Sequence, residues 1–337
     1  MPAQFFGLDI GRSFIKVVKV KEAGAKRTLE AAASLPTPNG GVMSESVVDL
    51  KKVAEGIRAC VSKAGIDADR AVVSIIESQV VTRLIQLPNL TDKELSAAIS
   101  WEAEQYIPLP IKDVNLQYKV ISRPAGGGQM DVLLIAAPKR VIDKYLSIAT
   151  DAGLTVAALE TESVALARAL TRAADPPTII VSMGAVSTEL VVVRDASVLF
   201  TRSVATGGVN LTRAIALEFN LPQNQAEEYK QTYGIQEDKL AGKVAAVLRP
   251  ILDILVSEIL KAIEFSKDHV GERSVQRLII TGGGAYMPGL SPYLAGSTSL
   301  EVSLGDAWAD LVKEGLILKK AGAGGIFAVA TGLALRS

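Results

Sequence analysis

The same local pattern, a buried strand followed by a small-residue turn and a returning strand, occurs once in each half of this 337-residue chain. The first copy spans residues 5–20 and the second spans residues 178–204, with Pro176 and Pro177 at the break between the halves. Two turns of this kind that face each other can grip a polyphosphate from opposite sides. The duplication therefore predicts an α/β protein of two related halves with a site between them.

The first turn has the composition of a phosphate-binding loop. Gly11, Arg12 and Ser13 let a tight turn point backbone N–H groups and a small hydroxyl at one spot, which suits a phosphate. Asp9 would repel a bare anion, so its presence indicates a Mg²⁺ ion, bound through water, between carboxylate and phosphate. Lys16 adds a positive charge from the returning strand. An ordinary β-hairpin that uses Asp and Gly for geometry alone is the alternative.

Two glycine-containing segments of the second half fit the same kind of site. The buried strand 178–183 is followed by a turn of small residues, 184–188, which repeats the first turn. The strand 275–281 is followed at once by three glycines, 282–284, which would let the backbone touch a flat or charged ligand closely. Such a triplet alone more often forms an ordinary turn, so only the joint pattern favours a ligand site.

The composition excludes several classes of function. Lysine plus arginine equals aspartate plus glutamate, with 36 of each, so the binding of nucleic acid by bulk electrostatics is not expected. The chain has one cysteine, Cys60, and one histidine, His269. An internal disulfide, a thiolate metal cluster and a histidine-based triad are therefore all excluded. We expect Cys60 on the apolar face of a helix, without chemistry of its own.

The sequence predicts neither a signal peptide nor a membrane span. The N-terminus lacks a charged start followed by an apolar stretch. No run reaches the roughly 20 apolar residues of a spanning helix, and the nearest case, 324–335, is short and rich in small residues. We expect a cytoplasmic protein whose association with a membrane comes through a partner.

Helical periodicity surrounds these strands. Apolar residues at helical spacing predict a helix that ends at Gly65 and another at 163–174. A long helical pattern at 240–269 contains Pro250, which should kink it or separate two helices. An apolar helix at 326–335 is expected to close the chain against its beginning.

Residues 77–160 follow a different plan. Strands and helices alternate as β-α-β-β-α-β and finish with a strand at 155–160, which predicts a small inserted α+β module. Thr91 and Glu94 form a capping box at the start of its first helix. The module has no phosphate-type turn, and its exposed helix and sheet edge are more typical of a contact surface than of a catalytic site.

Five segments, taken in their order along the chain, resemble motifs of the actin-like ATPase superfamily. This superfamily includes sugar kinases, actin, heat-shock chaperones and the cell-division protein FtsA. DIGRSFIK at 9–16 and SMGAVSTEL at 182–190 resemble its two phosphate motifs, and IITGGGAYMPGL at 279–290 resembles its adenosine motif. Residues 160–170 and 321–334 resemble its two connecting helices. The resemblance implies two ribonuclease-H-like halves.

A narrower resemblance is to the PilM family of type IV pilus assembly proteins. It rests on LPNLTDKELSAAISWEAEQYIPLPIKDVNLQYKVI at 87–121, on LFTRSVATGGVNLTRAIALEFNL at 199–221 and on EEYKQTYG at 227–234. It implies four subdomains, with the inserted module as an FtsA-type subdomain 1C. Subdomain 1A would hold 1–76, 161–175 and 322–337; subdomain 1C would hold 77–160; subdomain 2A would hold 176–206 and 275–321; and subdomain 2B would hold 207–274.

The resemblance also implies an ATP or ADP site with Mg²⁺ between the halves. Asp9 would hold the Mg²⁺ shell through water, and Glu162 would position an attacking water as the catalytic residue. The nucleotide-binding residues implied by the resemblance are Asp9, Gly11, Arg12, Ser13, Lys16, Gly184, Ala185, Ser187, Thr188, Gly207, Gly208, Asn210, Glu227, Lys230, Gly282, Gly283 and Gly284.

One departure from the superfamily pattern concerns turnover. The second phosphate motif normally opens with an aspartate, and here Ser182 holds that place. Catalysis of phosphoryl transfer depends mostly on positioning and charge neutralisation, so the loss of one carboxylate can cost orders of magnitude in rate. We therefore expect nucleotide binding with slow or no hydrolysis.

The resemblance implies a cytoplasmic scaffold of the type IV pilus inner-membrane platform. It would bind the N-terminal cytoplasmic tail of a PilN-like membrane protein in a groove between subdomains 1A and 1C. It would contact PilO through PilN, and the pilus motor ATPase is a further candidate partner. The run WEAEQYIPLP at 101–110 supports a contact surface, although its prolines also suit simple helix termination.

Two other functions fit the same fold. A filament-forming, membrane-associated protein like FtsA agrees with the fold and the insert, but FtsA ends in an amphipathic helix that is not expected after Leu335. A small-molecule kinase would need a carboxylate base near the transferred phosphate. Ser182 does not supply one, and no other carboxylate of that motif precedes Glu189.

Overall fold

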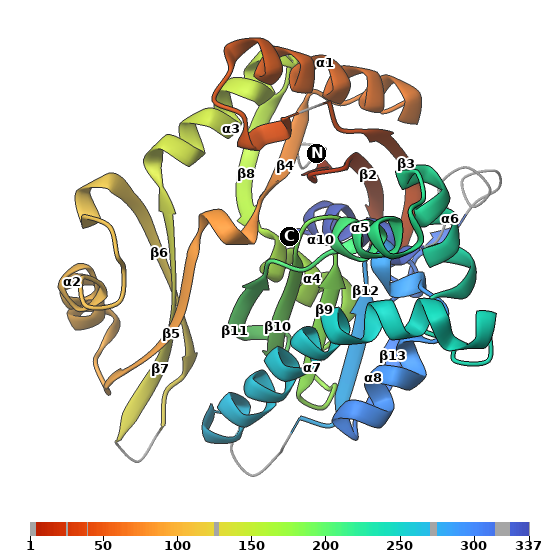
Figure 1. Ribbon diagram of the computed structural model, residues 1–337. Helices are drawn as coiled ribbons and strands as arrows, with labels where there is room; N and C mark the ends of the chain where they lie inside the picture. Colours follow the sequence, from red (N-terminus) through yellow and green to blue (C-terminus); the bar gives the residue numbers. More distant parts are fainter. Residues whose placement is uncertain are drawn as a thin grey trace.

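The computed structural model contains two large sheets and one smaller sheet, with helices packed on and between them (Figure 1). It describes residues 5–24, 26–38, 40–124, 128–269, 275–313 and 324–336. Residues 321–323 of the expected second connecting helix lie outside the described residues.

The first large sheet has six strands in the order β14-β3-β2-β1-β4-β8. Strand β1 is buried along its whole length, pairs antiparallel with β2 and parallel with β4, and so forms the centre of this half. Its strands are β1 (Phe6–Ile10), β2 (Phe14–Ala23), β3 (Lys26–Pro36), β4 (Arg70–Ile75), β8 (Thr155–Thr161) and β14 (Val312–Lys313).

The second large sheet has the order β11-β10-β9-β12-β13 and repeats the pairing of the first. In both sheets the leading strand pairs antiparallel with the next strand, which pairs antiparallel with the third. In both, the leading strand also pairs parallel with a later strand, β4 or β12. The duplication seen in the sequence is thus a duplication of sheet topology. The strands are β9 (Thr178–Met183), β10 (Thr188–Arg194), β11 (Ser197–Val204), β12 (Arg277–Thr281) and β13 (Glu301–Leu304).

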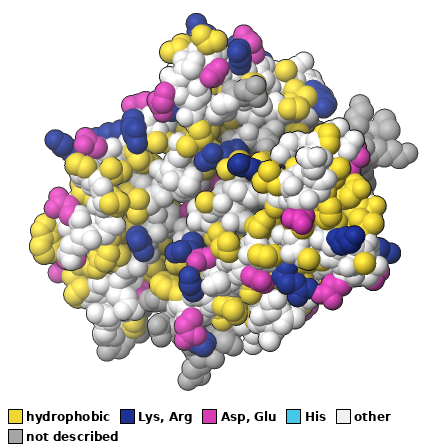
Figure 2. All heavy atoms as spheres, in the orientation of Figure 1, with side chains coloured by type: hydrophobic (Ala, Val, Ile, Leu, Met, Phe, Trp, Pro, Cys, Tyr) yellow, Lys and Arg dark blue, Asp and Glu magenta, His cyan; other side chains and the backbone are white. Residues whose placement is uncertain are grey.

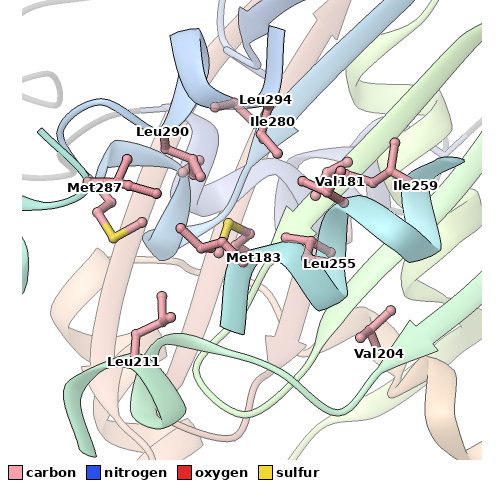
Figure 3. Packing of buried hydrophobic residues seen from close by; sticks show 14 of the residues in the cluster. Val181, Met183, Val204, Leu211, Leu255, Ile259, Ile280, Met287, Leu290 and Leu294 are labelled. Carbon is pink, nitrogen blue, oxygen red and sulfur yellow. The ribbon is translucent and has the colours of Figure 1, made fainter. Parts of the chain in front are cut away.

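Helices cover the second sheet and fill its core. Val181, Met183 and Ile280 of the sheet pack against Leu255 and Ile259 of the longest helix (Figure 3). Strands buried in this way read as continuous apolar runs, as 178–183 does. The helices of this half are α5 (Gly208–Phe219), α6 (Gln223–Tyr233), α7 (Lys243–His269) and α8 (Leu290–Thr298).

Helix α7 is continuous through Pro250, so the proline does not separate two helices. Proline lacks the N–H that would bond the carbonyl of Ala246, four residues earlier. Both residues lie on the exposed side of α7, where water can satisfy that carbonyl.

The third sheet is smaller, with the order β5-β7-β6. Helix α2 (Asp92–Ala103) packs on it and begins with the expected capping box of Thr91 and Glu94. In Figure 1 this unit extends to the left of the two large sheets. Its strands are β5 (Val81–Pro88), β6 (Val114–Ser122) and β7 (Gln129–Pro138).

The inserted module is shorter than the pattern predicted. Strand β8 pairs parallel with β4 in the first large sheet instead of closing the small sheet. Helix α3 (Lys139–Asp151) buries Tyr145 and Ile148 in the core of the first half, together with residues of helix α1 (Val47–Ala64). The periodicity of a strand identifies the strand but not its partner, and β8 satisfies the backbone groups along the edge of β4.

The two halves meet through helices α4 (Glu162–Leu170) and α10 (Ala328–Ala334), which lie between the large sheets (Figure 1). One apolar cluster joins Leu166 of α4 and Ala330 of α10 to Val18 of the first sheet and to Ile180 and Val191 of the second. The expected packing of the C-terminal helix against the start of the chain is confirmed by Gly7 and Ala330, because a Cβ at position 7 would lie 2.0 Å from the carbonyl oxygen of residue 330.

Cys60 is fully buried on α1, as expected. Among the helices within the described residues, none has the length and apolar character that a membrane crossing requires.

The contact between α4 and α10 allows no side chain at position 332. An alanine Cβ there would lie 1.9 Å from the carbonyl oxygen of Ala165, so backbone would have to move. We expect Gly332→Ala to lower the free energy of unfolding by about 3 kcal/mol, despite the gain in helix propensity. Urea denaturation followed by circular dichroism measures this change.

Gly296, in the exposed part of α8, is the matched control, because it is also a helical glycine and a Cβ added there would meet no atom within 4 Å. We expect Gly296→Ala to raise the free energy of unfolding by up to about 1 kcal/mol. Equal effects of the two substitutions would contradict the close packing of α4 and α10.

Candidate functional site

A cleft of about 800 Å³ lies between the two halves and is lined by both duplicated turns. Ser13 comes from the turn between β1 and β2, and Ser187 comes from the turn between β9 and β10. The start of α4 and the glycine segment after β12 also line the cleft. The structure thus brings the two turns together around one space, as the duplication predicted.

Most of the expected site residues line this cleft. Three do not, namely Thr188, Gly207 and Asn210. The expected residues that line it are Asp9, Gly11, Arg12, Ser13, Lys16, Glu162, Gly184, Ala185, Ser187, Gly208, Glu227, Lys230, Gly282, Gly283 and Gly284.

The three outlying residues hold the second turn in shape. The hydroxyl of Thr188 is buried and donates to the carbonyl of Thr206 at 2.6 Å. The side chain of Asn210 accepts from the N–H of Gly207 at 3.0 Å. A Cβ at Gly207 would lie 2.6 Å from the carbonyl oxygen of Ala185, so glycine is required for the helix α5 to approach the turn. These contacts give the residues a structural role.

In the first turn, Asp9 and Lys16 form an ion pair at 2.7 Å between Oδ2 and Nζ. The other carboxylate oxygen of the buried Asp9 accepts from the hydroxyl of Ser74 at 3.0 Å. Gly11 donates its N–H to the carbonyl of Phe14 and closes the hairpin. The exposed guanidinium of Arg12 has no hydrogen-bond or ion-pair partner among the residues that the structure describes. Arg12 is therefore available to an anion in the cleft.

The three glycines after β12 differ in their surroundings. Gly282, at φ +83°, and Gly284 lie against Met183 of β9, where a Cβ would come within 2.5 Å and 2.8 Å of its atoms. Figure 3 shows the side chain of Met183 within the core of this half. Gly283 lines the cleft, and a Cβ added to it would meet no atom within 4 Å. Only Gly283 therefore leaves its space to a ligand.

Lys230 is buried, and its ammonium group makes three hydrogen bonds within the protein. Nζ donates to Glu227 at 2.7 Å, to the hydroxyl of Thr212 at 2.9 Å and to the carbonyl of Gly208 at 3.1 Å. An ammonium has three donors, so this group is saturated. Burial opposes ionisation of Glu227, but hydrogen bonds from Lys230, Thr212 and Gln231 lower its pKa. The pair forms a fixed polar wall of the cleft.

Several carboxylates meet at the base of the cleft. Glu162 begins α4, and its Oε2 accepts from the N–H of Glu77 at 3.0 Å. Burial, followed by the negative charges of Asp9 and Glu189, raises the pKa of Glu162 well above its usual range. Burial and the neighbouring negative charges thus oppose ionisation of the expected catalytic residue.

Glu189 lines the cleft and was not among the expected site residues. It is buried on β10, and its Oε1 accepts from the hydroxyls of Ser187 at 2.9 Å and Ser203 at 2.8 Å. Burial raises its pKa from 4.5 to about 7. The sequence offered one signal, an acidic residue next to the apolar run LVVV, where an unpaired carboxylate is costly.

The acidic side chains that the structure describes in the cleft do not form a cluster that could bind a metal ion by themselves. Within the described ranges, no group of three or more His, Cys, Asp and Glu side chains is placed to hold a metal. A Mg²⁺ ion would therefore depend on ligand phosphates and waters, with Asp9 beside it. The cleft fits a nucleotide with Mg²⁺ because it combines glycine-lined walls, a free guanidinium and carboxylates.

A family model described as type IV pilus assembly protein PilM matches residues 7–337. The chain belongs to this family. A structure described as a PilM-PilN type IV pilus biogenesis complex is similar over 100% of this chain and 99% of that chain, with a TM-score of 0.85 and 30% identity. The resemblance of 87–121, 199–221 and 227–234 to the PilM family is thereby confirmed.

More distant relatives show how widely the fold is shared. The cell division protein FtsA of Enterococcus faecalis (strain ATCC 700802 / V583) is 24% identical over 331 residues, which cover 85% of this PilM-family chain and 74% of FtsA. The ADP-bound MreB5 of Spiroplasma citri has a TM-score of 0.56 at 11% identity and covers 98% and 95% of the two chains. The protein has the actin-like ATPase fold, as the phosphate motifs predicted.

The raised pKa of Glu189 predicts a pH dependence of stability. Between about pH 4.5 and 7 the folded protein binds a proton at Glu189 that the unfolded chain has lost. The native state is therefore destabilised as pH rises through this window, by about 3 kcal/mol at most. Glu189→Gln removes this term but keeps an oxygen that can accept from Ser187 and Ser203. We expect the variant to gain free energy of unfolding relative to the unsubstituted protein between pH 5 and pH 8.

Urea denaturation of both proteins at the two pH values measures the effect. Loss of the Glu189 charge also removes one cause of the raised pKa of Glu162, so the comparison reports Glu189 together with this coupling. A difference between the two proteins that is the same at pH 5 and pH 8 would contradict the assignment.

Proposed function

We propose that the protein is an ATP- or ADP-binding scaffold of the type IV pilus inner-membrane assembly platform. It lies at the cytoplasmic face of that membrane and is held there by the N-terminal tail of a PilN-like membrane protein. The observation that carries the proposal is the single cleft bounded by both duplicated turns, in a chain of the PilM family. The cleft volume of about 800 Å³ is within the range of small-molecule and cofactor sites.

The two turns supply donors for the phosphates. Among the described residues, the backbone N–H groups of Arg12, Ser13, Ala185 and Val186 donate to no acceptor in the protein. Successive free N–H groups of this kind form an anion-binding concavity. Arg12 adds a free charge, and Lys16 adds a second when the phosphates and their cation compete for its partner Asp9. The phosphates would thus lie between the turns.

The nucleoside end of the cleft is a separate region. Gly283 opens one wall there, and Tyr286 and Met287 follow it in and just after the same 3₁₀ segment. Glu227 and Lys230, which also line the cleft, are held by each other and present fixed polar groups. In this arrangement Glu227, which retains free lone pairs, accepts from the sugar hydroxyls, and Lys230 orients Glu227.

Slow or absent hydrolysis is part of the proposal. A Mg²⁺ ion neutralises charge on the phosphates when it is bound, but an attacking water also needs a partner that orients it. Glu162 is the best placed carboxylate at the start of α4, yet burial and its negative neighbours favour its protonated form. A carboxyl group that ionises with difficulty is a weak acceptor for the proton of water, and Ser182 supplies no second acid, so hydrolysis is slow. A long-lived bound state suits a scaffold.

The partner proposal is supported by the similarity to the protein in the PilM-PilN complex. We propose that the tail lies where subdomains 1A and 1C meet, as an extended peptide. PilO, reached through PilN, and the pilus motor ATPase are further proposed partners. The start of the run at 101–110 belongs to α2, which Figure 1 shows at the outer side of the small sheet.

The surface over α2 is partly apolar. Figure 2 shows hydrophobic side chains at the left edge of this face, in the position that α2 occupies in Figure 1. Trp101 is 67% exposed, and Tyr106 and Leu109 are also exposed. This surface over α2 is an alternative binding position for the tail. Peptide binding combined with the quenching of Trp101 distinguishes it from the groove between subdomains 1A and 1C.

Nucleotide binding is tested by filling the cleft at Gly283. A leucine there meets no protein atom near its Cβ but occupies the nucleoside end. We expect the unsubstituted protein to bind a fluorescent ATP analogue and Gly283→Leu to bind it at least ten times more weakly, with an unchanged melting temperature. Gly296→Ala, outside the cleft lining, serves as the control. Equal affinities of all three proteins would refute the proposed site.

Tail binding is tested with a labelled N-terminal peptide of a PilN-like protein and its scrambled sequence. We expect the native peptide to bind at micromolar concentrations in fluorescence anisotropy and the scrambled peptide to fail. Trp101 is exposed and Trp308 is buried, so iodide quenching of tryptophan fluorescence reports on Trp101 alone. Unchanged quenching in the complex is expected for the groove, whereas protection of Trp101 would place the tail on α2.

A further inference from the structure

The duplicated turns carry complementary residue pairs at equivalent positions. Asp9 stands two residues before Gly11, and Lys16 stands five residues after it. Ser182 and Glu189 stand two residues before and five residues after Gly184. In each half the two residues are direct partners across antiparallel strands, Asp9 with Lys16 and Ser182 with Glu189. Cross-strand partners project from the same face of a sheet.

Each of these two strand pairs therefore presents one carboxylate to the cleft, and the two carboxylates come from non-equivalent strands. In the first half the acid is on the leading strand β1 and the cation is on β2. In the second half the leading strand β9 carries the hydroxyl of Ser182, and the acid Glu189 is on β10. Both Ser182 and Glu189 line the cleft. The acid that is missing at position 182 has a counterpart directly across the strand pair.

The two carboxylate oxygens of Glu189 differ in their hydrogen bonds. Both hydroxyl donors, from Ser187 and Ser203, are directed to Oε1. Oε2 is buried and has no hydrogen-bond partner within the described chain. An unsatisfied buried carboxylate oxygen is costly, and the protein retains it at the wall of a cleft. A group that enters the cleft is the remaining source of a partner.

The chemistry of the cleft identifies that group. A phosphate has no proton to donate at neutral pH and would be repelled by a carboxylate. A hydrated divalent cation suits Oε2, because its waters donate hydrogen bonds and its charge offsets the carboxylate. The fixed Oε1 holds the side chain in place, so Oε2 is preorganised to accept.

We propose that Glu189 is the second-half carboxylate that accepts from the water shell of a divalent cation bound together with the nucleotide. Asp9 faces the same shell from the first half. This inference rests on the proposed nucleotide site. It assigns to Glu189 of β10 the contact with the water shell of the cation that an acid at position 182 would otherwise make. Ser187 and Ser203 position Glu189 for this contact.

The test compares nucleotide affinity with Mg²⁺ and with EDTA for the full chain, using a fluorescent ATP analogue. We expect Mg²⁺ to strengthen binding to the unsubstituted protein. In Glu189→Gln this strengthening is expected to shrink at least tenfold, while the affinity in EDTA is unchanged or higher because a negative charge is gone. A merely structural role would weaken binding in both conditions.

The double variant Glu189→Gln with Ser182→Asp is the rescue, because it moves the carboxylate to the paired strand. We expect it to recover most of the Mg²⁺ effect. Titration of Mn²⁺ into each nucleotide complex, followed by electron paramagnetic resonance, gives a second readout. We expect at least tenfold weaker Mn²⁺ binding in Glu189→Gln and recovery in the double variant.

Each outcome decides between the claims. If the unsubstituted protein binds no nucleotide, the proposed function fails and the role of Glu189 fails with it. If it binds nucleotide and Glu189→Gln keeps the full Mg²⁺ and Mn²⁺ dependence, the site stands and the assignment of Glu189 is overturned. Equal weakening in Mg²⁺ and in EDTA would indicate a merely structural role of Glu189, and would also overturn the assignment.

Discussion

The close contact of helices α4 and α10 between the two large sheets is the constraint on which the rest of the structure depends. Gly332 lets α10 approach the carbonyl of Ala165 without a side chain between the helices. The apolar cluster around them includes strands of both halves, so the helices fix how the halves lie relative to each other. Because α4 begins at Glu162, the same contact places that carboxylate at the base of the cleft.

The cleft contains buried carboxyl groups whose ionisation is unfavourable, and the packing of the surrounding core offsets this cost. Glu162 and Glu189 are both kept from ordinary solvation, and the pKa of each is raised by burial. A raised pKa in the folded state means that ionisation of either carboxyl group lowers the stability of the ligand-free protein. Retention of such groups at a cavity wall is typical of a site whose ligand supplies the missing charge. Stability and ligand binding therefore oppose each other at these two positions.

The separate small sheet gives the molecule a second region that is independent of the cleft. Its core of Ile85, Leu95 and Met130 is distinct from the cores of the two halves. Lys119 of β6 contacts Ser197 of β11, so the unit also touches the second half.

Local sequence signals predicted the elements well where the signal was itself local. The αL glycine at the end of α1 and the capping box of α2 follow from residues within four positions of each other. The partner of β8 could not be predicted in this way, because its strand pattern fits any open edge. The role of Gly207 also depended on a neighbour distant in sequence, the second turn, whose Ala185 carbonyl leaves no room for a Cβ.

The amino-acid sequence by itself determined that two equivalent strand-turn-strand units exist, that both turns contain small residues suited to phosphate, and that the first unit adds charged residues. It did so because turn geometry and strand burial are written in neighbouring residues. Only the tertiary structure decided that Lys230 is saturated, that Gly283 alone of its triplet faces open space, and that Glu189 stands beside Ser182 with one free oxygen. These properties depend on which atoms meet across strands and helices, and the chain sets those distances only after it has folded.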